Sequence, residues 1–343
     1  MSNFKEIILA ANKKVSSITG GTDKSKRLTY IDIAKGIGIF LVVVGHCIPD
    51  ASSATGIAIP AYRWLYGVIY SFHMPLFFFL AGFMISRQKM LERSQKPIDF
   101  VRRRISRLLV PYLFVGLCYA PFKMLLAKFA NKPYDISTLW QIVIGVNPDG
   151  ELWFLYALFV VTAVAALFAF RISLLGLVVS AGLFIWNPWD IVTNYLFFFL
   201  LGIYMRREYM DFVARLTCRH VILAGGVFLL GIYGLLVMKQ HACFLFTSVS
   251  GIVLLLWGSL YLERKKYSFG TLLERWGILS MDIYILSDIM KIPLRIILWN
   301  KLHLYTLSFI VCTILAVALS VWISTHIIRK NDLLKFLILG IRK

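Results

Sequence analysis

Residues 30–48 read YIDIAKGIGIFLVVVGHCI, an apolar run about as long as a bilayer is thick. Asp32, Lys35 and His46 interrupt this run with polar side chains. A helix turns by about 100° per residue, so Lys35 and His46 point within about 20° of each other, and Asp32 lies about 40° from His46. The run therefore predicts a membrane-spanning helix with one polar face, which has to face protein or water.

The whole chain has the composition of a membrane protein. Apolar residues make up 59% of its 343 positions, charged residues make up 16%, and the mean hydropathy is +0.76, whereas soluble domains are far more polar. Ten segments approach the length needed to cross a bilayer, at about 31–48, 66–86, 108–127, 152–170, 172–186, 190–205, 220–238, 242–262, 277–298 and 304–328. We therefore expect an all-α polytopic membrane protein with about ten transmembrane helices.

The distribution of basic residues predicts the orientation. With the N-terminus inside, 28 of the 37 Lys and Arg residues fall on inner segments and 8 on outer ones, with Lys35 inside the first span. This asymmetry follows the positive-inside rule and explains the net charge of +20 without a nucleic-acid partner. We expect cytoplasmic tails at 1–30 and 329–343 and one membrane domain at 31–328.

The second span contains SFHMPLFFFLAGF, residues 71–83. It enters from the outer side, so His73 should lie at a depth comparable to that of His46. Pro75 cannot donate a backbone hydrogen bond to the carbonyl of Ser71, and a polar group elsewhere has to satisfy that carbonyl. Two histidines at one level indicate a site, although a proline kink beside a structural histidine is the alternative.

The third span follows the basic stretch RRRISRLLVPY, residues 102–112. Arg104 and Arg107 are three residues apart and share a helical face at the predicted cytoplasmic boundary. A guanidinium group can bind phosphate through two hydrogen bonds, so the pair could hold a phosphorylated ligand. Contact with lipid head groups explains the spacing equally well.

The fourth span opens with GELWFLYALF, residues 150–159. Trp153 is expected in the aromatic belt at the outer interface. Glu151 is either an exposed loop acid or a carboxylate close to the two histidines, and the sequence leaves both interpretations open.

These motifs together resemble acyltransferase family three, a group of integral membrane enzymes that acylate polysaccharides, sugars and related acceptors. Lys35 and His46 match the family's basic residue and histidine with ten positions between them, and Asp32 stands at its leading aspartate. Arg104 and Arg107 fit its Arg-x-x-Arg motif. The first-span motif and the arginine motif in combination are fairly specific.

Further segments extend the resemblance over most of the chain. FHMPLFFFLAGF is similar to the second-span signature of the fucose acetylase branch, and LWFLYAL and SMDIYIL are similar to later family segments. One position departs from the pattern, because Ser287 stands where members often have a histidine.

The resemblance implies transfer of an acyl group, commonly acetyl, from cytoplasmic acyl-coenzyme A to a hydroxyl of a cell-envelope glycan or sugar. It implies an integral protein of the bacterial cytoplasmic (inner) membrane in contact with membrane lipid, and no metal. The expected catalytic residues are His46, His73 and Glu151. The expected donor-binding residues are Lys35, Arg104 and Arg107, with Asp32 and Trp153 in support. His46 would act as a general base or as an acyl-accepting nucleophile.

Two other classes of protein fit parts of the sequence. A transporter or exporter of a sugar or lipid-linked glycan would also place charged residues and kinked helices inside the membrane. A non-catalytic scaffold is compatible with Ser287, but the presence of His46 argues against it. The sequence predicts neither the oligomeric state nor the identity of the acceptor.

Overall fold

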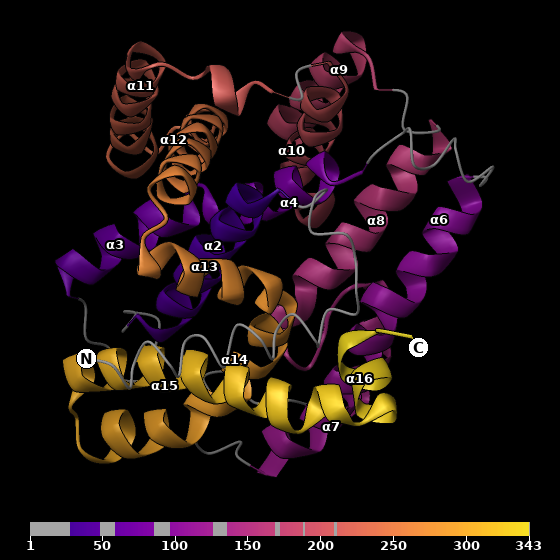
Figure 1. Cartoon of the computed structure of the whole chain (residues 1–343). Helices are drawn as coiled ribbons and strands as arrows, with labels where there is room; N and C mark the ends of the chain where they lie inside the picture. Colours follow the sequence, from indigo (N-terminus) through magenta and orange to yellow (C-terminus); the bar gives the residue numbers. More distant parts are fainter. Residues whose placement is uncertain are drawn as a thin grey trace.

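A computed structural model describes residues 28–48, 59–85, 97–125, 136–168, 172–187, 189–208 and 211–342. Every regular element in these ranges is helical, as the composition predicted (Figure 1). The predicted tail at 1–30 lies outside the described residues except for its last three.

The α-helices follow one another along the chain as α2 (Thr29–Cys47), α3 (Pro60–Tyr70), α4 (His73–Phe83), α6 (Pro97–Arg104), α7 (Val110–Leu125), α8 (Trp153–Leu167), α9 (Leu174–Trp186), α10 (Asp190–Glu208), α11 (Cys218–Leu236), α12 (Cys243–Lys265), α13 (Ser268–Ile278), α14 (Ser280–Arg295), α15 (Tyr305–His326) and α16 (Asp332–Leu339). A π-helical turn, Ile105–Leu109, joins α6 to α7. A short 3₁₀ turn, Gly150–Leu152, leads into α8.

Seven helical segments of the described chain are long and apolar enough to cross a membrane, and two shorter apolar helices accompany them, Leu174–Trp186 and Val192–Arg206. The ninth predicted span corresponds to α14, which is not among these segments. It has 16 residues and contains an internal proline and several charged side chains. The total of ten spans and the cytoplasmic position of the termini therefore stay predictions.

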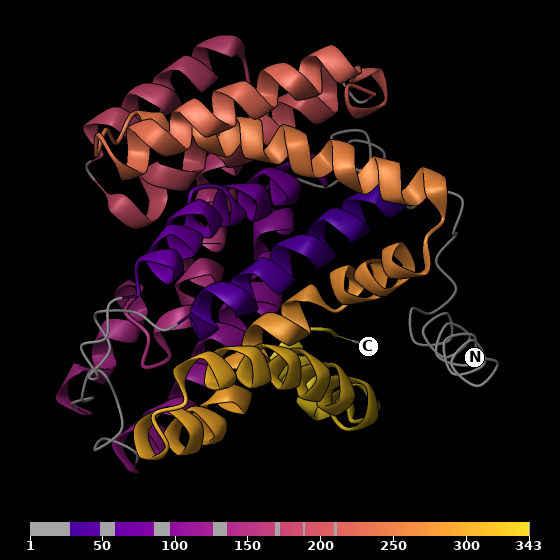
Figure 2. The same ribbon diagram turned by 90° about the vertical axis from the view of Figure 1, so that its left-hand side faces the viewer.

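The first span, α2, lies at the centre of the molecule. The pair of helices α11 and α12 covers one side of it, and the pair α14 and α15 covers the other (Figures 1 and 2). Helices α3, α4 and α13 also pack against α2. Its polar face is thus surrounded by protein, as a charged membrane helix requires.

Helix α13 was not predicted, because residues 263–275 read as a polar inner segment. It lies along α2, and two glycines bring the helices together at backbone distance. A Cβ at Gly36 would overlap the carbonyl of Leu273, and a Cβ at Gly277 would overlap the carbonyl of Asp32. Small residues at such crossings let the backbones of two membrane helices approach closely.

The second span is broken between α3 and α4, at Ser71 and Phe72, three residues before Pro75. The carbonyl of Ser71, which Pro75 cannot serve, accepts a hydrogen bond of 2.6 Å from the hydroxyl of Ser248 on α12. The prediction that a polar group would satisfy this carbonyl is confirmed. The break places His73 at the start of α4, with its side chain fully buried.

Candidate functional site

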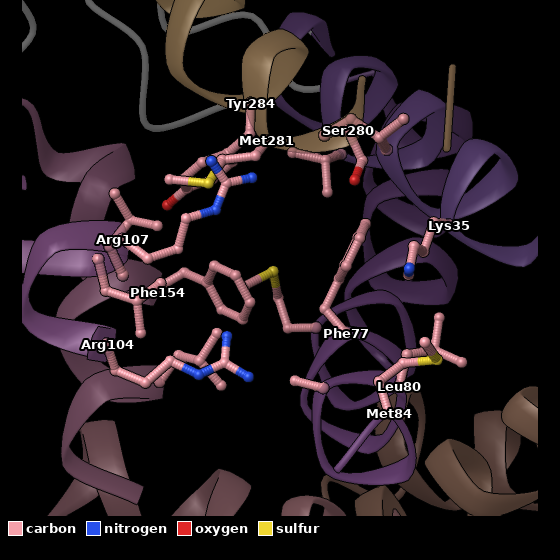
Figure 3. A pocket seen from close by; sticks show the side chains of 17 residues that line it. Lys35, Phe77, Leu80, Met84, Arg104, Arg107, Phe154, Ser280, Met281 and Tyr284 are labelled. Atoms are coloured by element: carbon pink, nitrogen blue, oxygen red, sulfur yellow. The ribbon is translucent and has the colours of Figure 1, made fainter. Parts of the chain in front are cut away.

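A cavity of about 240 Å³ lies between α2, α4, α8, α14 and the π-helical turn (Figure 3). Its walls are mostly aliphatic and aromatic, and three cationic side chains reach it. Arg104 and Arg107 enter from one side and Lys35 from the opposite side. Such a cavity suits a ligand that joins an anionic group to an apolar chain.

The cavity follows the predicted polar face of α2. Lys35, Ile39 and Val42 line it, at the spacing of successive helical turns. His46 lies one turn beyond Val42, just past the end of the cavity, and does not line it. Asp32 pairs with Lys35 at 3.4 Å, so it neutralises part of the charge at the opposite end.

The two arginines stand on an unusual stretch of helix. Arg104 ends α6, and Arg107 lies inside the π-helical turn. π-Helical turns rotate the side chains that follow them, and they occur frequently at functional sites. Arg107 donates a hydrogen bond to the carbonyl of Leu339 at the end of α16, and Arg104 lies over the ring of Phe100 at 4.9 Å. The predicted C-terminal tail at 329–343 thus includes a helix that supports a cavity residue.

His46 and Glu151 meet beyond the inner end of the cavity. Nδ1 of His46 lies 3.2 Å from Oε1 of Glu151, and their side chains are 24% and 17% exposed. The hydroxyl of Tyr70 lies 3.4 Å from the same ring nitrogen. When Nδ1 carries a proton and donates it to the carboxylate, Nε2 keeps a lone pair that can accept another proton.

Glu151 has a second cationic neighbour, Lys291 of α14, with which it forms an ion pair. The ammonium group of Lys291 also lies 2.7 Å from Asp288, and the hydroxyl of Tyr119 donates to Asp288 at 2.7 Å. The side chains of Lys291 and Asp288 are 6% and 10% exposed. The His46–Glu151 pair is therefore one end of a buried charged network that connects α2, α7, α14 and the 3₁₀ turn before α8.

Tyr284 connects this network to the cavity. Its ring lines the cavity, and its hydroxyl donates a hydrogen bond to the backbone carbonyl of Glu151. Its ring also meets Phe154 edge to face at 5.7 Å. A group at the inner end of the cavity would thus lie close to the residues that hold the His46–Glu151 pair.

His73 lies near the pair but does not contact Glu151 in the described structure. Nδ1 of His73 lies 2.7 Å from the carbonyl of Ile69, a geometry that requires this nitrogen to carry the proton. The ring meets that of Tyr70 edge to face at 4.6 Å between centroids. In its neutral form His73 therefore presents Nε2 as a hydrogen-bond acceptor.

Trp153 is half-buried at the start of α8 and packs on neighbouring helices. Its ring lies 5.1 Å from that of Tyr195 and 6.4 Å from that of Phe78. These contacts place Trp153 among protein side chains, whereas the sequence pattern predicted a place in the aromatic belt at the membrane interface. Trp153 thus fixes the start of α8, two residues after Glu151.

Asp149 lies one residue before the membrane span Gly150–Leu167 and is buried. One carboxylate oxygen accepts a hydrogen bond from the backbone N–H of Glu151 at 3.0 Å. Burial and the charge of Asp288 raise the pKa of Asp149 to about 7, although that hydrogen bond, Lys291 and Lys123 act in the opposite direction. This acid therefore titrates near neutral pH beside the network.

The comparison with protein families agrees with this geometry. A family model described as an acyltransferase domain matches residues 28–325. The chain belongs to acyltransferase family three. No curated protein and no solved structure matches it. The matched range contains both the cavity and the charged network of this acyltransferase, whereas the fucose acetylase branch stays a prediction.

Sequence reasoning missed three members of the network in this acyltransferase. It treated Lys291 as an outer topology charge and did not connect Asp288 or Tyr119 with a site. The available signal was an acid and a base three residues apart in a mainly apolar segment, since intramembrane charges mark functional sites by default. No local spacing connects that segment to Glu151, 140 positions away.

Proposed function

We propose that this membrane acyltransferase moves an acetyl group from acetyl-coenzyme A to a hydroxyl of a cell-envelope glycan or sugar, in the bacterial cytoplasmic membrane. The observation that carries the proposal is the alignment along α2 of a cavity with three cations and, one turn beyond it, the His46–Glu151 pair. A donor with phosphates at one end and a thioester at the other matches this order.

The donor would bind with its phosphates at Arg104, Arg107 and Lys35. Guanidinium groups bind phosphate oxygens with strong, charge-assisted hydrogen bonds. Lys35 and His46 are eleven residues apart, or about 16 Å along a helix, which is similar to the reach of an extended pantetheine arm. The apolar walls of the cavity would surround that arm and lead the thioester toward His46.

The chemistry needs one base and one orienting carboxylate. Nε2 of His46 accepts the proton of the acceptor hydroxyl while the oxygen attacks the thioester carbonyl. The carbon–sulfur bond then breaks, and the proton passes from His46 to the departing thiolate, which leaves free coenzyme A and an acyl ester. Glu151 acts as a positioning residue, because it holds Nδ1–H and stabilises the imidazolium. A transient acyl-histidine is the alternative route through the same residue.

His73 would bind the acceptor in this scheme. Since Ile69 holds the proton on Nδ1, the free Nε2 can accept a hydrogen bond from a second sugar hydroxyl. The same geometry argues against the other expected role, donation to the oxyanion, for which a neutral His73 has no remaining N–H. A His73→Gln variant should therefore raise the KM for the acceptor more than the KM for the donor.

The test is transfer by purified protein in lipid nanodiscs. Radiolabelled acetyl-coenzyme A and a panel of envelope saccharides would be incubated with the wild type, and the product would be identified by mass spectrometry. We expect ester formation by the wild type, loss of turnover of at least about a thousandfold in His46→Ala, and normal turnover in the control His326→Ala, whose exposed side chain lies at the end of α15.

A second arm tests donor binding. Arg104→Ala and Arg107→Ala should each weaken donor binding by about tenfold or more, because each removes a charge-assisted phosphate contact. Normal turnover in a well-folded His46→Ala protein would contradict the mechanism. Sugar flux across vesicles without any dependence on acyl-coenzyme A would favour a transporter instead.

A further inference from the structure

The buried network contains more charge than a histidine and its carboxylate need. Lys291 holds two carboxylates at once, those of Glu151 and Asp288, and Tyr119 adds a hydrogen bond to the second. Removing a lysine or an aspartate from water is costly, and a structural role alone is often filled better by apolar residues. The network therefore requires an explanation beyond helix packing.

The formal charges of the network indicate its purpose. With both carboxylates ionised and paired with Lys291, Glu151 and Asp288 contribute two negative charges and Lys291 one positive charge, so the group carries a net charge of minus one while His46 is neutral. When His46 accepts a proton, the group becomes neutral. In a medium of low dielectric constant, a reaction that removes net buried charge is favoured over one that creates it.

Below about pH 7, where Asp149 keeps its proton, the surrounding groups do not change this balance. Among the described residues, the titratable groups around His46 and Lys291 include Tyr70 on α3, His73 on α4, Cys47 on α2, Tyr284 on α14, Cys312 on α15 and Asp149 before α8. We count the fully buried His73 as neutral, with its proton on the Nδ1 that faces the carbonyl of Ile69. Asp149 keeps its proton below about pH 7, and the charge of nearby Lys123 opposes its own when that proton is lost.

We propose that Lys291 and Asp288 are positioning residues that set the charge around His46, with Lys291 holding Glu151 ionised and aimed at Nδ1 and Asp288 providing the remaining negative charge. The role of this network in acyl transfer rests on the proposed function. Its effect on the protonation of His46 does not, and it can be measured in the absence of any substrate.

The test is a double-mutant cycle read by the chemistry of His46 itself. Diethyl pyrocarbonate modifies neutral imidazoles, and the His46 side chain is 24% exposed. The extent of modification at His46 would be measured by mass spectrometry between pH 5 and pH 8 in the wild type, Asp288→Asn, Lys291→Met and the double variant. Exposed His326 in the same protein serves as the internal control.

Asp288→Asn removes a negative charge, so the midpoint of His46 modification should move to lower pH by about half a unit or more. Lys291→Met removes a positive charge and should move the midpoint to higher pH. The double variant restores the net charge of minus one, so its midpoint should return close to that of the wild type. His326 should stay unchanged throughout.

Turnover provides the second readout. Each single variant should lower kcat by about thirtyfold or more, and the double variant should be more active than Lys291→Met, which independent structural roles would not produce. Lys291→Arg should retain most of the activity. Unshifted midpoints in folded single variants, or midpoint shifts that fail to cancel in the double variant, would overturn the proposal. Shifted midpoints in a protein that transfers no acyl group would overturn the proposed function alone.

Discussion

Replacing Glu151 by Gln removes one charge from the site with little change in size. In the wild type, Oε1 of Glu151 lies 3.2 Å from Nδ1 of His46. Two opposite charges about 4 Å apart attract each other by about 4 kcal/mol at an effective dielectric constant of about 20. This attraction exists only when His46 is protonated, so its loss should lower kcat by roughly a thousandfold.

The assay for Glu151→Gln is acetyl transfer at saturating donor and acceptor, with the KM for the donor measured separately. The donor KM should change little, because Glu151 does not line the cavity. Glu208→Gln, at the exposed end of α10, is the matched control and should have normal turnover. If folded Glu151→Gln protein kept kcat within about threefold of the wild type, the assignment of Glu151 as the partner of His46 would be wrong.

Three further predictions concern stability and donor binding. Folded Asp149 keeps its proton up to about pH 7, whereas the unfolded chain releases it near 3.8, so the wild type should lose about 2 kcal/mol between pH 5 and pH 7; thermal unfolding of Asp149→Asn should not show this loss. Gly340→Val should raise the donor KM, because Gly340 has φ of 64° and abuts the backbone of the helix that carries Arg107; direct titration with coenzyme A would measure this effect. Asp282→Leu should destabilise the protein by about 3–5 kcal/mol in a thermal unfolding assay, because it leaves Arg329, now paired at 2.7 Å and 2.9 Å, without its buried carboxylate.

The first span was predictable in detail because helical geometry is local. The positions of Lys35 and His46 on one face follow from their spacing, and the cavity runs along that face. The arginine motif was predictable for the same reason, and the structure brings both of its residues to the cavity. The need of the Ser71 carbonyl, which Pro75 cannot serve, for another hydrogen-bond donor was also predictable, although the identity of that donor was not.

The remaining part of the site depends on contacts between distant segments. Lys291 reaches Glu151 only because α14 packs against α2, and no period or motif in the sequence encodes that contact. Helix α13 was missed because polar residues flank it, although its glycines hold it against the first span. Hydropathy predicts which segments leave water, but it cannot predict which charged side chains find each other once they have done so.

The gap between α3 and α4 divides the second span into two parts with different duties. Tyr70, at the end of α3, contacts His46, whereas Met74 and Phe77, in α4, line the cavity. Where the two parts meet, the hydroxyl of Ser248 on α12 donates a hydrogen bond to the backbone carbonyl of Ser71. The distance between the cavity and His46 is thus set in part by α12, a helix that contributes no residue to either. Engineering of the enzyme for a longer acyl chain could therefore begin at the contact between Ser248 and Ser71, away from the residues that perform chemistry.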